Sequence, residues 1–454
     1  MSWPAVVLWI VLVFGILMPP PFLLYCFFAF GSFATLDLIP HELVGGFDMN
    51  SQSFCALLII AKILLAKGNP RRGLEAALDP ARLGVLFLFL AYGLFSAYVM
   101  PRLFEHRVEV FPTSAQLDWP VLLEPTMQNI SQSAYMTLSV GMALAFTLVG
   151  GRPEFRRHYL QALLFGGLVL IATGLLDMTM ASVGLADLLE PFRNTSGGTP
   201  LVNDSVLGSK RVVGLMSEAS AYGGSCVAAA SSLAFLRPCF PDWQRLWLVP
   251  AAIGGLIVMS YLSTSSSAYI GLGAFGLFFV VNWLRRYLTP WAPDREGLKW
   301  EAFIVIAAAL LWLILIVLSP TVLDPIYEMV DTMIFKKTET SSYIGRTNWT
   351  KAGMDAFFAT DGFGVGLGSA RTSNWFVAVL SNTGVIGATL LAWFIAQIFL
   401  RRCQSDPRTV EFVTALRFSL LPFFVTAALA GTIPDFGAGR GAIFGFVVSL
   451  TSNK

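Results

Sequence analysis

The sequence predicts an all-α membrane protein that crosses the bilayer about twelve times. Hydrophobic residues make up 56% of the 454 residues, charged residues make up only 13%, and the mean hydropathy is +0.68. A soluble domain of this length needs a far more charged surface. Apolar runs of about 20 residues recur along the chain, which is the length that a bilayer-spanning helix requires. We therefore expect one integral membrane domain over residues 1–454, without a soluble appendage.

Basic residues set the expected orientation of the chain. Short polar breaks hold more than half of the 30 Lys and Arg residues, and the positive-inside rule places such breaks in the cytoplasm. They are residues 67–82, 151–159, 237–245, 285–300 and 401–408. The three longest segments between them, residues 101–134, 179–220 and 320–373, are then expected to be periplasmic loops.

The apolar segments between these loops are expected to be membrane helices. They lie at about residues 52–66, 84–100, 135–150, 160–178, 221–236, 246–262, 268–284, 301–319, 378–400, 411–431 and 440–450. The first 36 residues contain three consecutive prolines from Pro19 to Pro21, so they allow either one long kinked span or a short hairpin. We prefer one crossing, which gives twelve helices with both termini in the cytoplasm. The segment lacks the basic start of a signal peptide, so we expect it to be retained.

Several kinds of function have no support in the sequence. The net charge of +2 is too small to suggest nucleic-acid binding. The three histidines, His41, His106 and His158, are scattered, so we expect neither a metal site nor a cofactor. The sequence contains no Walker A motif, so ATP is not the expected energy source. Ionisable residues are nearly absent from the centres of the spans, so an ion or proton relay through the bilayer is not supported.

The loop 179–220 ends in "GSKRVVGLMSEASAYGG", which places charges beside the start of a helix. Lys210 and Arg211 precede a helix that is expected to begin near Ser217. Glu218 lies in its first turn, where the helix dipole favours an acid. Composition alone favours a structural role, with Arg211 as the partner of Glu218 or as a headgroup anchor. The alternative places both charges at a cavity at the outer end of the bundle.

The loop 320–373 contains a helix-forming stretch and then a glycine-rich turn. In "SSYIGRTNWTKAGMDAFFATDGFGVGLG", Trp349, Ala352, Ala356 and Phe357 share one helical face. A helix that lies on the outer membrane surface has this pattern. The glycines from 362 to 368 then return the chain to the bilayer. They form either a tight turn that needs positive φ angles, or a backbone cradle for an anion beside Arg371.

Two further polar stretches lie at the outer ends of helices. "YLSTSSSAYIGLGAF" is a tight turn, and its hydroxyls from Ser263 to Ser267 either satisfy backbone groups or hydrogen-bond a polyol. "IPDFGAGRGAIFG" places Asp435 and Arg440 at the outer end of the last helix. An ion pair is the default interpretation of these two residues.

The order of these motifs resembles the bacterial O-antigen polymerase and ligase superfamily of membrane glycosyltransferases, over about residues 200–400. "RVVGLMSEAS" looks like the R-x-x-G-x-x-x-E-P-S segment of that family, with Ala219 in place of the proline. "STSSSAYIGL" looks like its serine-rich turn. The strongest likeness lies in "GRTNWTKAGMDAFFATDGFGVGLGSARTSN" and the following "LSNTGVIG". It resembles the long periplasmic loop of the family that returns into the next helix.

The resemblance implies a GT-C-like fold in the bacterial inner membrane, with an active site that faces the periplasm. The family acts on glycans carried by undecaprenyl diphosphate, and transfers them to a hydroxyl without a metal, with inversion of the anomeric centre. A chain-length regulator and a flippase of the same pathway are the implied partners. Ligases of the family typically carry a histidine where this chain has Ser373. This departure favours a polymerase of O-antigen or exopolysaccharide.

The same resemblance assigns roles to residues at the outer ends of the helices. Negative charge grows on the leaving diphosphate, and arginine binds phosphate in a bidentate manner. The expected catalytic residues are Arg211, Glu218, Arg346 and Arg371. Glu218 is expected either to orient or deprotonate the acceptor hydroxyl, or to position Arg211. The expected substrate-binding residues are Lys210, Tyr222, Ser266, Gly366, Gly368, Ser373, Asn374 and Arg440. Tyr222 either stacks on a sugar or packs in the core.

Three other functions stay open from the sequence. A ligase that transfers the glycan to lipid A core would have the same fold and a different acceptor. A solute transporter fits the number of helices, but it does not explain the scarce intramembrane charges and the long outer loops. A scaffold for an assembly complex is the third alternative.

Overall fold

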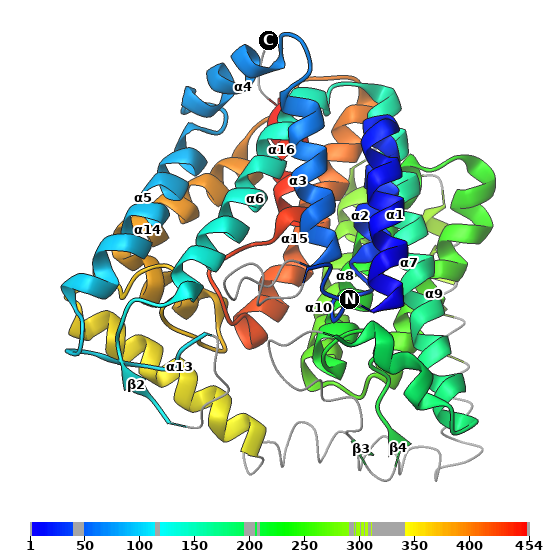
Figure 1. Cartoon of the computed structure of the whole chain (residues 1–454). Helices are drawn as coiled ribbons and strands as arrows, with labels where there is room; N and C mark the ends of the chain where they lie inside the picture. Colours follow the sequence, from blue (N-terminus) through cyan, green and yellow to red (C-terminus); the bar gives the residue numbers. More distant parts are fainter. Residues whose placement is uncertain are drawn as a thin grey trace.

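The computed structural model describes residues 2–39, 50–113, 119–194, 205–206, 209–289 and 341–451, with isolated positions between 295 and 310. The chain is an all-α, multi-pass membrane protein (Figure 1). Eight helices of the described residues are long and apolar enough to cross a membrane, or nine if one bent pair counts as a single span. Most of the helix expected at 301–319 lies outside the described residues.

Most helices follow the expected apolar segments, although those at Met127–Val149 and Pro153–Ser182 begin eight and seven residues earlier than expected. The helices at Asn69–Leu78 and Ser341–Ala359 lie in segments that were expected to connect spans. The helices are α1 Trp3–Leu17, α2 Pro20–Phe30, α3 Ser51–Leu64, α4 Asn69–Leu78, α5 Gly84–Leu103, α6 Met127–Val149, α7 Pro153–Ser182, α8 Ala219–Leu236, α9 Val249–Leu262, α10 Ser266–Leu288, α13 Ser341–Ala359, α14 Trp375–Leu400, α15 Pro407–Ala430 and α16 Ala438–Thr451. Short helical turns lie at Ala186–Phe192, Arg237–Cys239 and Gln244–Leu248. Two antiparallel strand pairs join β1 Glu109–Val110 to β2 Val121–Leu122, and β3 Ser205–Val206 to β4 Ser209–Lys210.

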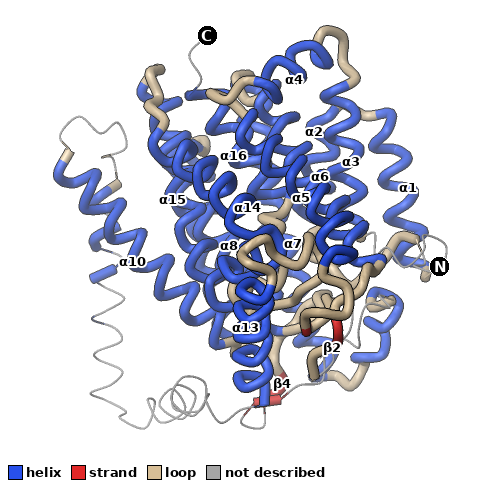
Figure 2. The backbone as a smooth tube through the Cα atoms, turned by 90° about the vertical axis from the view of Figure 1, so that its left-hand side faces the viewer, coloured by secondary structure: helices blue, strands red, loops and turns tan. Residues whose placement is uncertain are grey.

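The bundle has two different ends. The helix α4 lies at one end, which we call the basic end, and α13 lies with the strand pairs at the opposite end, which we call the loop end (Figures 1 and 2). Hydrogen bonds join two of the expected outer loops there. The N–H of Arg371 donates to the carbonyl oxygen of Phe111 at 2.8 Å, and Oγ1 of Thr113 donates to that of Gly368 at 3.0 Å. These bonds, together with the position of β3 and β4, place the described parts of the three long loops at the same end.

The two ends allow a direct test of membrane orientation. Lys351 is exposed in α13, and Arg408 is exposed at the basic end. A membrane-impermeant thiol reagent should label a Lys351→Cys variant in intact spheroplasts. It should label an Arg408→Cys variant only after the membrane is permeabilised. The opposite labelling pattern would place the loop end in the cytoplasm and rule out a periplasmic site.

The first 30 residues form a hairpin of two short helices, and this corrects the single kinked span that we preferred. The ring of Trp3 contacts that of Phe192 at the loop end, with centroids 5.2 Å apart. Nζ of Lys62, near the end of α3, donates to the carbonyl oxygen of Gly15 at 2.9 Å. The helix α1 therefore runs toward the basic end, and α2 returns. Pro20 begins α2 because a first helical turn does not need the N–H that proline lacks.

Glycines bring α16 directly against α6. A Cβ atom at Gly441 would stand 2.1 Å from the carbonyl oxygen of Ser139, and one at Gly445 would stand 2.4 Å from that of Ala143. A spacing of four residues places both glycines on one helical face. Small residues at this spacing let membrane helices approach closely. This contact fixes the start of α16 at the loop end, where Arg440 lies in the first turn.

The helix α14 is interrupted inside the bundle, and a loop completes its hydrogen bonding. Gly384 has a φ of 62°, which breaks the helical conformation. The N–H groups of Val365 and Gly366 donate to the carbonyl oxygens of Ser381 at 2.7 Å and Asn382 at 3.1 Å. Lipid cannot supply such donors, so a break at this depth needs a protein partner. The glycine-rich turn therefore belongs to the hydrogen-bonded interior of the bundle.

The stretch between residues 341 and 359 is helical, as predicted, and its small residues pack on protein. A Cβ atom at Gly353 would lie 2.6 Å from the side chain of Thr372 and 3.3 Å from that of Val377. Ala356 is 1% exposed and packs with Val365. The helix α13 thereby fixes the segment that leads from the glycine-rich turn into α14.

Candidate functional site

A cavity of about 310 Å³ lies at the loop end, where four helices begin. Its lining includes one residue from the first turn of each: Ser220 of α8, Ser267 of α10, Trp375 of α14 and Arg440 of α16. The start of a helix carries a partial positive charge. The volume is within the lower range of small-molecule sites. The position of the four helix starts therefore favours an anionic ligand.

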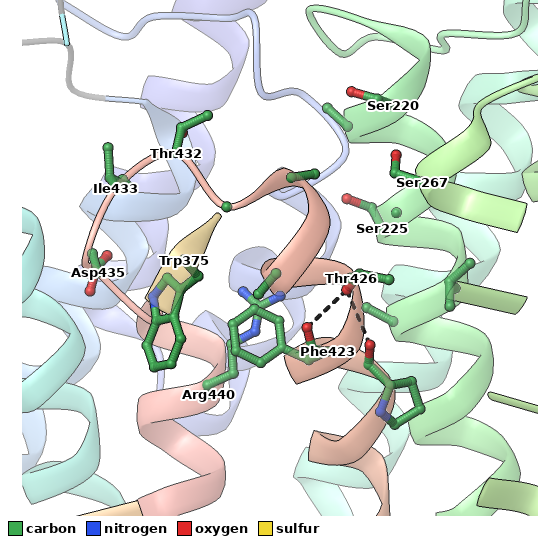
Figure 3. A pocket seen from close by; sticks show the side chains of 18 residues that line it. Ser220, Ser225, Ser267, Trp375, Phe423, Thr426, Thr432, Ile433, Asp435 and Arg440 are labelled. Atoms are coloured by element: carbon green, nitrogen blue, oxygen red, sulfur yellow. Dashed lines mark hydrogen bonds between the residues drawn. The ribbon is translucent and has the colours of Figure 1, made fainter. Parts of the chain in front are cut away.

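Hydroxyl groups and aromatic rings face each other across this cavity (Figure 3). Serines of α8 and α10 form one wall, and Trp375 lies opposite with the loop that joins α15 to α16. Thr432 belongs to that loop, and Phe423 lies beside Arg440 between the walls. Hydroxyls both donate and accept hydrogen bonds, as the hydroxyls of a sugar do. The lining therefore suits a polar ligand with ring faces.

Three of the four expected catalytic residues form a charged cluster beside the cavity. The hydroxyl of Ser220 donates to the carboxylate of Glu218 and links it to the lining. The guanidinium of Arg371 lies over the ring of Trp349, 4.0 Å from its centre. Burial lowers the pKa of Arg371, the positive charge of Arg346 adds to this decrease, and the negative charge of Glu218 opposes it. These three charges therefore act on one another, although they come from different loops.

Arg211 lies beside the serine-rich turn that joins α9 to α10. Its Nε donates to the carbonyl oxygen of Ser263 at 3.3 Å. Ser266 begins α10, and Ser267 extends the turn to the cavity. Thr264 in this turn has a φ of 45°, which is uncommon for a β-branched residue. Backbone strain of this kind tends to occur at functional sites.

Lys210 belongs to a buried network of hydrogen bonds around Asp177 that the sequence did not predict. Asp177 of α7 is 1% exposed, and Nζ of Lys210 donates to it at 2.8 Å. The carboxylate of Asp177 also accepts hydrogen bonds from the N–H groups of Val213 and Gly214, at 3.0 and 3.2 Å, and from Arg193 at 3.4 Å. A buried carboxylate needs such donors. Lys210 therefore anchors the loop before α8, and its expected contact with the substrate stays a prediction.

Tyr222 packs in the core and does not stack on a ligand. Its side chain is 0% exposed, and its hydroxyl donates to the carbonyl oxygen of Leu170 at 2.9 Å. A Cβ atom at Gly214 would lie only 2.8 Å from its ring, so the loop before α8 packs directly on it. Of the two roles that the sequence left open for Tyr222, the structure therefore supports packing in the core over stacking on a sugar.

Gly366 and Gly368 form a tight turn, and the expected anion cradle is wrong at these positions. Both have positive φ angles. A Cβ atom would lie 2.6 Å from the ring of Pro101 at Gly366, and 2.5 Å from the carbonyl oxygen of Gln128 at Gly368. Their N–H groups already donate to the backbone and side-chain oxygens of Asn382, each at 3.1 Å. They therefore have no free donor for a phosphate.

Ser373 and Asn374 hold the start of α14 in place. The N–H of Ser373 donates to Oγ1 of Thr350 at 3.2 Å, and its hydroxyl lies 3.5 Å from the carbonyl oxygen of Leu429. Oδ1 of Asn374 accepts from the N–H of Phe376 at 3.0 Å, as an N-cap residue does. Both residues therefore position Trp375 at the cavity.

Asp435 and Arg440 line the cavity, and within the described part of the chain no direct ion pair joins them, unlike the expectation from the sequence. The guanidinium of Arg440 lies over the ring of Phe423, 3.9 Å from its centre. Burial raises the pKa of Asp435 to about 6, while Ser139 and the charge of Arg440 oppose this increase. The two charges thus influence each other without direct contact.

Comparison with known proteins does not assign the site. No family model matches the chain, and no curated protein matches it. Among the described residues, no three His, Cys, Asp or Glu side chains come together as metal ligands.

Proposed function

We propose that this protein polymerises oligosaccharide repeat units that are linked to undecaprenyl diphosphate. One observation carries the proposal: a cavity of sugar size lies where four helices begin, and the cluster of Arg346, Arg371 and Glu218 lies beside it. Arg211 belongs to the neighbouring turn. Lipid-linked sugars combine an anionic diphosphate with polar rings, and this arrangement offers partners for both.

The proposed reaction is a metal-independent, inverting glycosyl transfer. The bond between the anomeric carbon and the phosphate oxygen breaks, and its electron pair stays on the diphosphate. Arg346 and Arg371, with Arg211, stabilise this growing charge. The acceptor hydroxyl attacks the anomeric carbon and loses its proton. Glu218 is the candidate residue to orient or deprotonate that hydroxyl, and its charge also stabilises Arg371.

An apolar groove offers a place for the lipid chain of such a substrate. The groove has a volume of about 500 Å³, lies between α14 and α15, and shares Trp375 with the cavity. Leu391, Phe399 and Phe424 are among its lining residues. A lipid in the bilayer could place its hydrocarbon chain there and its diphosphate near Arg371. In this proposal the loop end faces the periplasm of a bacterial inner membrane.

Purified protein and a labelled lipid-linked repeat unit test the proposal. We expect a ladder of longer lipid-linked glycans, and the same ladder in the presence of EDTA. Transfer to added lipid A core would instead indicate the ligase. Absence of any glycan transfer would contradict both enzymes and favour the transporter or the scaffold. Loss of transfer in EDTA, with recovery in magnesium, would contradict the metal-independent mechanism.

A further inference from the structure

Arg440 lies between two adjoining cavities. It lines the cavity of about 310 Å³ at the loop end and a second one of about 240 Å³ deeper in the bundle. Ser225 and Phe423 also line both cavities. The deeper one has further hydroxyls, from Ser232 and Ser419. Arg440 is therefore a lining residue that the two cavities share.

Among the described residues no ion pair to Arg440 forms, and Asp435 is the acid whose negative charge acts on its guanidinium. Its guanidinium lies over the ring of Phe423, and it makes no ion pair with Asp435. Asp435 is the only other charged residue among the described residues that line the outer cavity. The start of α16 carries a partial positive charge next to this guanidinium, and the repulsion further disfavours the charge of Arg440. A cation away from bulk water needs an anionic partner, and an aromatic ring meets this need only in part.

We propose that this cavity binds a sugar ring that carries a carboxylate, with Arg440 as the partner of that carboxylate. Arginine matches the planar geometry of a carboxylate with two parallel hydrogen bonds. Ser220, Ser225 and Ser267 offer hydroxyls to the rest of the ring. This inference rests on the proposed function, because it names the class of repeat unit that the polymerase takes: one with an acidic sugar.

The diphosphate is the other anion that Arg440 could hold. Arg346 and Arg371 already offer two guanidinium groups close to Glu218, which is hydrogen-bonded to the lining residue Ser220. Arg440 lines the cavity and does not line the apolar groove of α14 and α15, where the lipid chain is proposed to lie. We therefore assign the diphosphate to the cluster at the mouth, and the carboxylate to Arg440.

Binding of soluble glycans tests this inference without any turnover. The probes are a trisaccharide that contains glucuronic acid, its methyl ester, and the same trisaccharide with glucose. We expect the purified protein to bind the acid about ten- to hundredfold more tightly than either neutral probe. An Arg440→Gln variant should bind all three probes equally weakly. A Thr414→Val variant should bind as the unchanged protein does, because Thr414 lines neither cavity and its hydroxyl bonds to the carbonyl oxygen of Val410 in its own helix.

The outcomes separate this inference from the proposed function. Equal binding of acid and ester by the unchanged protein would overturn the inference, even if Arg440→Gln fails to fold. An Arg440→Gln variant that loses affinity for undecaprenyl diphosphate, and keeps its preference for the acid, would assign Arg440 to the diphosphate and overturn it too. A protein that prefers the acid but transfers no glycan would contradict the proposed function alone.

Discussion

Alanine in place of Arg371 is expected to slow glycan transfer about ten- to hundredfold or more. A hydrogen bond to a charged group contributes about 1.5–3 kcal/mol, and each factor of ten in rate corresponds to about 1.4 kcal/mol. Arg371→Lys should restore part of the rate, since lysine keeps the charge and loses the planar fork. We expect the same order of effect at Arg211 and Arg346. The measurement is the initial rate of transfer from a defined lipid-linked repeat unit.

Arg102 provides a matched control for Arg371. It also lies at the loop end, and its guanidinium covers the ring of Tyr98, 4.1 Å from its centre. It belongs to the end of α5 and does not line the described cavity. Arg102→Ala should transfer glycan at nearly the unchanged rate. If alanine at Arg371, Arg346 and Arg211 leaves the rate unchanged as well, the assignment of the diphosphate to these arginines is wrong.

A Gly384→Ala variant is expected to be much less stable than the unchanged protein. The φ of 62° at Gly384 is strained for alanine, and its Cβ atom would lie 2.3 Å from the carbonyl oxygen of Phe363. Strain of this kind costs about 1–3 kcal/mol, and the forced shift of packed backbone costs about 1–3 kcal/mol more. Fluorescence-detected size exclusion after heating in detergent would measure the loss of folded protein.

Gly276 in α10 is the matched control for this substitution. A Cβ atom there would have no neighbour within 4 Å. Alanine in a helix interior is favoured over glycine by about 0.5–1 kcal/mol. Gly276→Ala should therefore be as stable as the unchanged protein, or slightly more stable. Equal thermal stability of the Gly384→Ala and Gly276→Ala variants would show that the break in α14 does not require glycine.

The membrane helices could be predicted from the sequence because each depends on a local property. An apolar run long enough for the bilayer has few alternatives to a helix. The prolines near Pro20 were ambiguous for a physical reason, since proline can either kink a helix or begin one. The contacts of Lys62 and Trp3 decide between these outcomes, and both join residues that are far apart in the sequence.

The candidate site was predictable only in part. The resemblance of the motifs pointed to Arg371 and Glu218, and the structure places them within electrostatic reach. The roles of Gly366 and Gly368 depend on Asn382, and no local pattern reveals that partner. Asp177 could have been recognised in the sequence, because an acid near the end of a predicted span needs a partner, and Lys210 is that partner in the structure. Tyr222 was undecided, because stacking and packing require the same residue type.

Part of the positive potential at the cavity comes from peptide groups at the starts of α8, α10, α14 and α16. Peptide dipoles have no proton to lose in alkaline buffer, and no side-chain substitution removes them. Part of the attraction of anions to the cavity should therefore persist in a variant that lacks Arg211, Arg346 and Arg371 and keeps Arg440. Non-hydrolysable bisphosphonates should compete with substrate over a wide range of pH. Such compounds would use a feature of the backbone, against which single-residue resistance is hard to acquire.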